Sequence, residues 1–184
     1  FYFKILSIYS NLTISTVNPL LHKFVDELYK GNLISDKNIE ILPSSNDNLC
    51  FDKKGRKKVF AFLRDDECKN SKLIIKLIND KLLSNVDWVI LDLRKDKIGL
   101  LPNNNHNILE YYDCYLEHKE VINLLATTDY LIYPSFFEGF GLLVNEAIEK
   151  NVIPLIGPLC LFKEHKNVLL INNYKYLTWQ SALL

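Results

Sequence analysis

Methionine is absent from all 184 residues, so we expect this chain to be a piece of a longer polypeptide. Net charge is also absent, because Lys plus Arg and Asp plus Glu each total 22. This balance argues against broad electrostatic binding to nucleic acid. No apolar run approaches the roughly 18 to 20 residues that span a bilayer. Residues 1–10 lack the small-residue cleavage site of a signal peptide, so we expect a cytoplasmic protein.

Metal and redox motifs are missing as well. No Cys-x-x-Cys pair occurs, which favours reduced thiols in a cytosolic protein over a zinc or redox centre. The four cysteines are isolated from one another: Cys50, Cys68, Cys114 and Cys160. Three histidines, His22, His106 and His165, are too widely spaced to suggest a metal site. The sequence also lacks Gly-x-Gly-x-x-Gly after the first strand of its α/β region, which disfavours a dinucleotide-dependent oxidoreductase.

The second half of the chain alternates short apolar runs with amphipathic segments. We expect strands at residues 59–63, 88–93, 107–112, 130–133 and 152–156, and helices at 71–83, 119–126 and 142–150. Short, nearly continuous apolar strands are typical of a parallel sheet that is covered on both faces. The alternation therefore predicts an α/β fold with right-handed crossovers and helices on both faces of the sheet.

The first part of the chain shows a different organisation. Residues 12–16 and 39–42 have the composition of strands, and residues 19–30 have helical spacing. The polar stretch 44–58 is typical of a linker or a long loop. Its basic run, residues 53–58, is expected to be a solvated connection rather than a binding patch.

A glycine turn follows the expected strand at 130–133. Gly139 and Gly141 allow positive φ and close approach of a ligand to the backbone. The next helix begins near Leu142, and its first amides have no partner within the helix and favour negative charge. Ligands of parallel sheets lie beyond the carboxyl ends of the strands, so a diphosphate would fit here. Many such turns contain glycine and bind nothing, and that alternative stays open.

Two glutamates flank this turn. Glu138 lies just before the helix and Glu146 in its second turn, so both carboxylates can border one cleft. A carboxylate is a good acceptor for the vicinal hydroxyls of a sugar or ribose. In the alternative interpretation Glu146 is a solvated helix residue and Glu138 only complements the helix dipole.

This stretch resembles a known family. The matching residues are Pro134-Ser135, Glu138-Gly139-Phe140-Gly141-Leu142, Glu146-Ala147 and residues 152–156. They are similar to the signature of retaining glycosyltransferases with the GT-B fold, group 1 or family 4, whose hallmark is Glu-x7-Glu. Upstream, Arg64 and Lys69 resemble the family's Gly-Arg-x4-Lys-Gly segment, and residues 39–43 resemble its hinge strand. The resemblance runs from about residue 12 to the end of the chain.

The resemblance implies a role for each matching residue. Arg64 and Lys69 would neutralise the donor diphosphate and stabilise the departing nucleoside diphosphate in place of a metal. The amides of residues 139–142 would bind the phosphates. Glu138 would contact the donor sugar near the reacting carbon, and Glu146 would hold the ribose. No metal or other cofactor is expected.

It also implies an organisation and an activity. Residues 1–43 would end the acceptor-side domain and form the hinge, and residues 44–184 would form a truncated, Rossmann-like donor-binding domain. The whole protein would be a hexosyltransferase that moves a UDP- or GDP-linked sugar to a glycan or lipid-linked acceptor in polysaccharide biosynthesis. The fragment alone would not be competent, and any peripheral membrane association would come from the missing part. The alternative is a catalytically inactive GT-B-like nucleotide-binding or scaffold module.

Several positions depart from the family pattern. Leu63 and Asn70 stand where the family has glycines around the Arg-x4-Lys segment, and Cys114 stands where glycine is common. Residues 157–160 replace a common Gly-Gly turn. Each lost glycine is expected to crowd the donor, which favours the inactive alternative.

Other residues near the motifs have ordinary interpretations. Arg64 would be a plain surface cation if the resemblance did not apply. His118 is either a nucleobase neighbour or a residue of the helix cap region, and the cap region is favoured. The tyrosines Tyr111, Tyr112 and Tyr115 are expected to be strand and core aromatics rather than a sugar-stacking platform.

Overall fold

The computed structural model describes residues 55–99, 107–138, 141–160, 162 and 165–184. The elements expected within residues 1–43 and the division of the chain at residues 43 and 44 lie outside this part and remain predictions. Gly139 and Phe140 of the glycine turn also lie outside it.

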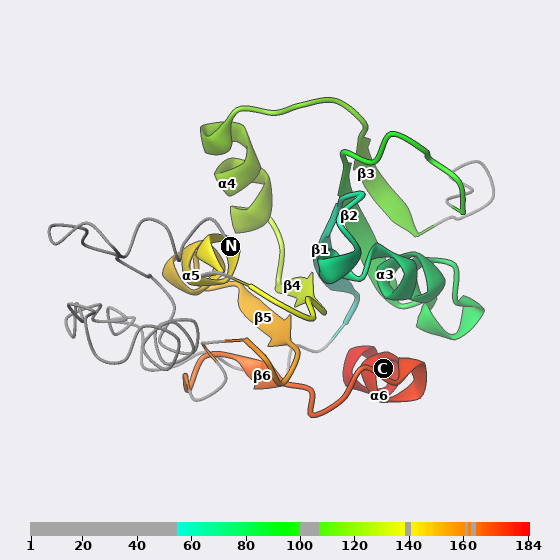
Figure 1. Cartoon of the computed structure of the whole chain (residues 1–184), viewed down its shortest axis with the longest axis vertical. Coiled ribbons are helices and arrows are strands. Elements are labelled where there is room, and N and C mark those ends of the chain that lie inside the picture. The colour runs from blue at the N-terminus through cyan, green and yellow to red at the C-terminus, as the bar shows by residue number, and fades with distance from the viewer. Residues whose placement is uncertain (1–54, 100–106, 139–140, 161, 163–164) are drawn as a thin grey trace, which may run out of the picture. The chain divides into compact units, whose positions relative to one another are not determined.

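The described part is built on a parallel sheet of six strands in the order β3-β2-β1-β4-β5-β6 (Figure 1). The strands are β1 Lys57–Leu63, β2 Val86–Asp92, β3 Ile108–Tyr112, β4 Tyr130–Tyr133, β5 Ile153–Ile156 and β6 Leu169–Leu170. The chain builds outward from β1 to β3, then returns to the other side of β1 to lay down β4, β5 and β6. The direction of strand addition therefore reverses between β1 and β4.

Helices cover both faces of the sheet. The helices are α3 Ser71–Ile78, α4 His118–Ala126, α5 Leu142–Glu149 and α6 Tyr176–Leu183. Helices α3 and α6 lie against one face, and α4 and α5 lie against the other (Figure 1). This arrangement confirms the Rossmann-like α/β prediction.

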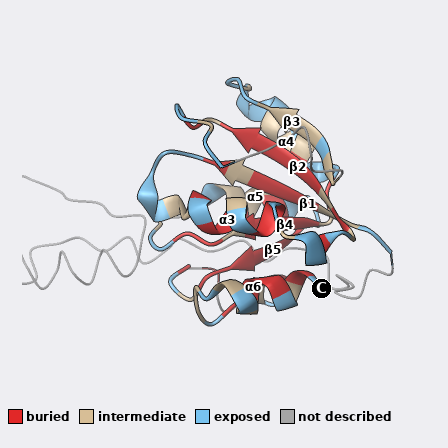
Figure 2. Cartoon of the chain, turned by 90° about the vertical axis from the view of Figure 1, so that its right-hand side faces the viewer, coloured by how far each residue is buried: buried red, intermediate tan, exposed pale blue. Residues whose placement is uncertain are grey.

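Strand β1 shows why the sheet is buried on both sides. Val59, Ala61 and Leu63 point into the apolar cluster beneath α3 and α6, while Phe60 and Phe62 pack into the cluster beneath α4 and α5. Side chains alternate across a strand, so a continuous apolar run supplies both cores. Figure 2 accordingly shows the central strands as buried, between helices that expose their outer sides.

Most expected elements are confirmed, with small differences at their ends. Residues 71–83 do not form one helix: α3 ends at Ile78, and the side chain of Asp80 accepts a hydrogen bond from the Leu82 amide at 2.9 Å to start a separate 3₁₀ turn, Lys81–Leu83. Neither β6 nor α6 was predicted. Among the residues that the structure describes, none of the helices has the length and apolar character that a membrane crossing requires.

The expectation that the basic run is a solvated connection is wrong for its last three residues. The Arg56 guanidinium pairs with the Asp87 carboxylate, and Lys57 and Lys58 begin β1. The Lys58 ammonium lies 3.3 Å from the Glu110 carboxylate. These cations connect the start of β1 to β2 through Asp87 and to β3 through Glu110.

Candidate functional site

The loops that follow β1 and β4 meet at the carboxyl edge of the sheet. These strands are neighbours, and the order of the sheet reverses between them, which is where open α/β sheets bind ligands. The amide of Phe136, in the loop after β4, donates a 2.7 Å hydrogen bond to the carbonyl of Cys68, in the loop after β1. The two loops are therefore joined through their backbones.

A single serine closes the loop after β1. The Ser71 hydroxyl, at the first residue of α3, donates to the Arg64 carbonyl at 2.7 Å and accepts from the Arg64 amide at 3.0 Å. This fixes the backbone of Arg64. Its guanidinium is exposed, lies 5.8 Å from the centre of the Phe62 ring, and forms no ion pair with any described residue. A cation in this position is available to an anionic ligand.

The structure brings two of the predicted site residues into direct contact. The Lys69 ammonium forms an ion pair with the Glu138 carboxylate, and the two side chains are only 20% and 9% exposed. The same ammonium lies 5.8 Å from the centre of the Tyr133 ring. Burial, and then the neighbouring Glu138 carboxylate, raise the pKa of Tyr133. Lys69, Tyr133 and Glu138 therefore form one cluster, and Tyr133 was not singled out from the sequence.

The start of α5 has the geometry that the glycine turn predicts. Gly141 has φ +82° and ψ +48°, a left-handed conformation that favours glycine. Its carbonyl accepts hydrogen bonds from the amides of Val144 and Asn145 at 2.9 and 3.2 Å, which begins the helix. The side chain of Leu142, the first helical residue, is exposed. The N-terminus of α5, where the first amides of a helix have no partner within the helix, therefore follows directly on the loop after β4.

Glu146 contacts a residue of the neighbouring helix. Its Oε1 lies 3.3 Å from Nε2 of His118, the first residue of α4. Burial raises the pKa of Glu146, with His118 opposing this rise and Glu149 adding to it. The interpretation of Glu146 as a purely solvated helix residue is therefore wrong, because its side chain is only 20% exposed.

His118 lies in the cap region of α4, as expected, because it is the first residue after the N-cap. The start of α4 is capped by its neighbours, since the Glu117 amide donates to the Glu120 carboxylate at 2.7 Å. The histidine side chain is left to contact α5. Tyr111 and Tyr112 pack against the cores as expected, whereas Tyr115 is 81% exposed and is not a core residue.

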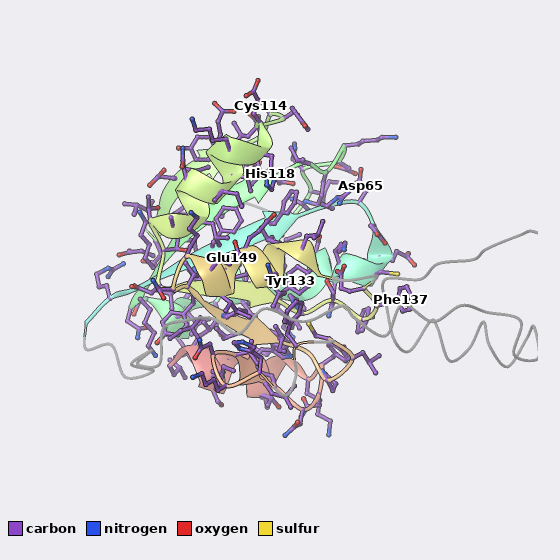
Figure 3. The ribbon with its side chains drawn as sticks, turned by 90° about the vertical axis from the view of Figure 1, so that its left-hand side faces the viewer. Asp65, Cys114, His118, Tyr133, Phe137 and Glu149 are labelled. Carbon is purple, nitrogen blue, oxygen red and sulfur yellow. The ribbon has the colours of Figure 1, made fainter. Side chains whose placement is uncertain are left out.

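A cavity of about 590 Å³ lies beside this cluster, between the loop after β1, the start of α3 and the segment after β2. It is lined by Arg64, Asp65, Asp66, Glu67, Asn70, Ser71, Lys72, Ile75, Arg94, Asp96, Ile98, Gly99 and Phe136. Figure 3 labels Asp65 and Phe137, which come from the two loops that meet here. Of the predicted site residues that the structure describes, Arg64 lines this cavity. Lys69, Glu138 and Glu146 do not line it.

A buried ion pair stands at the end of β2. Asp92 is fully buried, and Arg94 donates to its two carboxylate oxygens from Nε at 2.9 Å and from Nη2 at 2.8 Å. Burial opposes ionisation of Asp92, but the hydrogen bonds and charge of Arg94 outweigh it and lower the pKa of Asp92. The Tyr111 hydroxyl adds a further hydrogen bond at 3.1 Å. These residues hold the cavity wall in place.

One departure from the family pattern, at Asn70, and one glycine, Gly157, have a structural explanation. Asn70 has φ +54° and ψ +40°, a left-handed conformation that asparagine adopts more readily than most residues. It therefore provides the backbone geometry that a glycine would. Gly157 must be a glycine, since a Cβ there would lie 2.5 Å from Cε1 of Tyr174, whose hydroxyl donates to the Ser135 carbonyl at 2.9 Å.

Solved structures resemble this chain in fold, whereas sequence comparisons find no match. No family model matches the sequence, and no curated protein matches it. Among solved structures, the catalytic domain of starch synthase IV from Arabidopsis thaliana, bound to ADP and acarbose, matches with a TM-score of 0.59 at 19% identity over 77% of this chain and 31% of that chain. An Escherichia coli trehalose-6-phosphate synthase bound with UDP-2-fluoro glucose matches with a TM-score of 0.55 at 12% identity over 71% and 36%.

A third match is a UDP-forming trehalose-phosphate synthase from Burkholderia vietnamiensis, with a TM-score of 0.54 at 13% identity over 70% of this chain and 36% of that chain. The described domain has the fold of a GT-B C-terminal domain. The chain spans about a third of the length of these GT-B structures. The similarity concerns the fold, and the roles of Arg64, Lys69, Glu138 and Glu146 remain predictions.

Proposed function

We propose that this chain is the nucleotide-sugar donor domain of a retaining glycosyltransferase. The proposal rests mainly on the cluster at the carboxyl ends of β1 and β4. There Lys69, in the loop after β1, forms an ion pair with Glu138, in the loop after β4. Glu146 lies in the second turn of the helix that follows the second of these loops. The GT-B fold supports the same conclusion, since solved structures that share it hold UDP-2-fluoro glucose or ADP.

In this proposal the donor diphosphate lies between the two cations and the start of α5. Arg64, which has no ion-pair partner among the described residues, and Lys69 bind the phosphates together with the amides that begin α5. Glu146 accepts hydrogen bonds from the ribose hydroxyls, and Glu138 accepts them from the sugar. Two cations beside a departing nucleoside diphosphate stabilise charge as it develops, so a metal ion is not required for that step.

The reaction then proceeds by attack of an acceptor hydroxyl on the same face of the sugar that the diphosphate leaves. The bond between the anomeric carbon and the phosphate oxygen breaks, and that oxygen takes the proton of the acceptor. Configuration is retained, as in the glycosyltransfer with retention studied for a trehalose-6-phosphate synthase of the same fold. We propose a UDP- or GDP-linked sugar as donor, a glycan or lipid-linked acceptor, and a place in polysaccharide biosynthesis in the cytoplasm.

Calorimetric titration with UDP, GDP and ADP tests the proposal. One nucleotide is expected to bind with a micromolar dissociation constant, in buffer with EDTA as well as without it. Glu146→Ala should weaken that binding by at least about tenfold. Glu149→Ala is the matched control, because Glu149 lies on the same helix and is exposed, with its carboxylate bonded to Asn145. A folded chain that binds none of the three nucleotides would instead support a scaffold module.

A further inference from the structure

His118 and Glu146 join two helices at the edge of the candidate site. Helices α4 and α5 lie side by side on one face of the sheet (Figure 1). Nε2 of His118 lies 3.3 Å from Oε1 of Glu146, with the imidazole 76% exposed and the carboxylate 20% exposed. Figure 3 shows His118 on α4, above α5, which carries Glu149. An exposed imidazole therefore contacts a carboxylate that is itself largely shielded from solvent.

The position of His118 on its own helix does not explain this contact. The first turn of a helix disfavours a positive charge, because the unpaired amides there carry the positive end of the dipole. Capping is already provided by Glu117 and Glu120. What favours a hydrogen-bond donor at this position is the carboxylate on α5.

The contact leaves half of the Glu146 carboxylate for a ligand. A carboxylate has two oxygens with about four acceptor sites. Oε1 faces His118, and Oε2 has no hydrogen-bond partner among the described residues. A half-buried carboxylate with one oxygen held and the other open is oriented for a second donor, such as a hydroxyl of a ribose.

We propose that His118 is a positioning residue of the donor site, which donates a hydrogen bond to Oε1 of Glu146 and thereby directs Oε2 toward the ribose of a nucleoside diphosphate. The inference rests on the proposed function, in which Glu146 binds the ribose. His118 touches the carboxylate and acts on the nucleotide through it.

Three variants test the role by calorimetry with the nucleotide that binds best. His118→Ala should weaken binding about five- to tenfold, whereas Lys119→Ala, the neighbouring exposed residue, should leave it unchanged within about twofold. His118→Gln retains a hydrogen-bond donor, so it should recover much of the lost affinity. Wild-type affinity in His118→Ala, or no recovery of affinity in His118→Gln, would overturn the proposal.

A second measurement separates this inference from the proposed function. The imidazole NMR signals of His118 in the nucleotide-free protein should change in Glu146→Gln, and unchanged signals would show that the contact does not form. Failure of the wild type to bind any nucleoside diphosphate would overturn the proposed function and the positioning role together. Nucleotide binding that is normal in His118→Ala would overturn only the role of His118.

Discussion

The Lys69 ammonium and the Glu138 carboxylate form an ion pair that joins the loop after β1 to the loop after β4. Both side chains are shielded from solvent, and the ring of Tyr133 lies against the ammonium. An ion pair in such surroundings is screened less by salt than one on the surface. A diphosphate that binds Lys69 therefore has to compete with Glu138 for the same cation.

The first prediction follows from this competition. Glu138→Gln should tighten the binding of a nucleoside diphosphate by about three- to tenfold, because the competing carboxylate is removed. Lys69→Gln should weaken it by at least about tenfold. Both effects are measured by calorimetric titration with UDP, GDP and ADP. Lys72→Gln, on the first turn of α3, is the control for loss of a nearby cation. Weaker binding in Glu138→Gln would mean that Glu138 orients Lys69 toward the phosphates rather than competing with them.

The second prediction concerns the cost of keeping Glu146 charged. Burial raises its pKa in the folded protein above the unfolded value, so the fold favours the protonated form. Its contribution to stability is present below the unfolded pKa and is lost as the pH rises through the folded pKa. Glu146→Gln should therefore melt a few degrees higher than wild type at pH 7, and the difference should disappear at about pH 4.

The same variant should lose nucleotide affinity, since a carboxamide is a poorer acceptor than a carboxylate. Thermal unfolding followed by circular dichroism at the two pH values, together with titration, measures both effects. Glu149→Gln, one turn along on the same helix, serves as control and should melt close to wild type. A lower melting temperature for Glu146→Gln would show that its contact with His118 outweighs the desolvation of the carboxylate.

The sheet could be predicted from the sequence because its strands are buried on both faces. A short, continuous apolar run such as residues 130–133 is typical of a strand that is buried on both faces. β4 has the expected bounds. Strand β6 has only two residues, too few for any pattern. Helix α6 is held by a few specific contacts, including Trp179 in the core and the Tyr176 hydroxyl on the Asp80 carboxylate. Such long-range contacts leave no periodic signal.

The site was predicted less completely. The resemblance indicated Lys69, Glu138 and Glu146 and their ligand groups, but gave no reason for Lys69 and Glu138 to pair with each other. That contact exists because β1 and β4 are neighbours in the sheet, which is a property of strand order. The contact of His118 with Glu146 was missed because the two residues lie on different helices. Only the packing of α4 on α5 brings the two together.

The third prediction concerns the buried pair Asp92 and Arg94. Asp92→Asn leaves the Arg94 guanidinium buried without its carboxylate and should cost about 3 to 5 kcal/mol in the free energy of unfolding. The pKa of Asp92 is lowered in the folded protein, so its contribution is present above the unfolded pKa and is lost as the pH falls through the folded pKa. Urea unfolding at pH 7 and below pH 4 should therefore show a smaller pH dependence in Asp92→Asn than in wild type.

The exposed pair Arg56 and Asp87 supplies the comparison for that experiment. Asp87→Asn should cost less than about 1 kcal/mol, because Arg56 remains solvated. If Asp92→Asn and Asp87→Asn destabilised the protein equally, burial would not be what makes the Asp92 carboxylate necessary.

The last prediction concerns Asn70, which stands where the family has a glycine. Its φ of +54° costs most residues with a Cβ about 1 to 2 kcal/mol, so Asn70→Ala should destabilise the fold by about that amount. Asn70→Gly should change the free energy of unfolding by less than about 0.5 kcal/mol, because both residues accept this conformation. Chemical denaturation measures both. Nucleotide affinity should stay within about twofold of wild type in Asn70→Gly, since the asparagine side chain lines the neighbouring cavity with Arg64 rather than joining the Lys69 and Glu138 pair. A large gain in affinity would instead mean that the asparagine side chain crowds the phosphates, and that loss of this glycine had weakened the donor site.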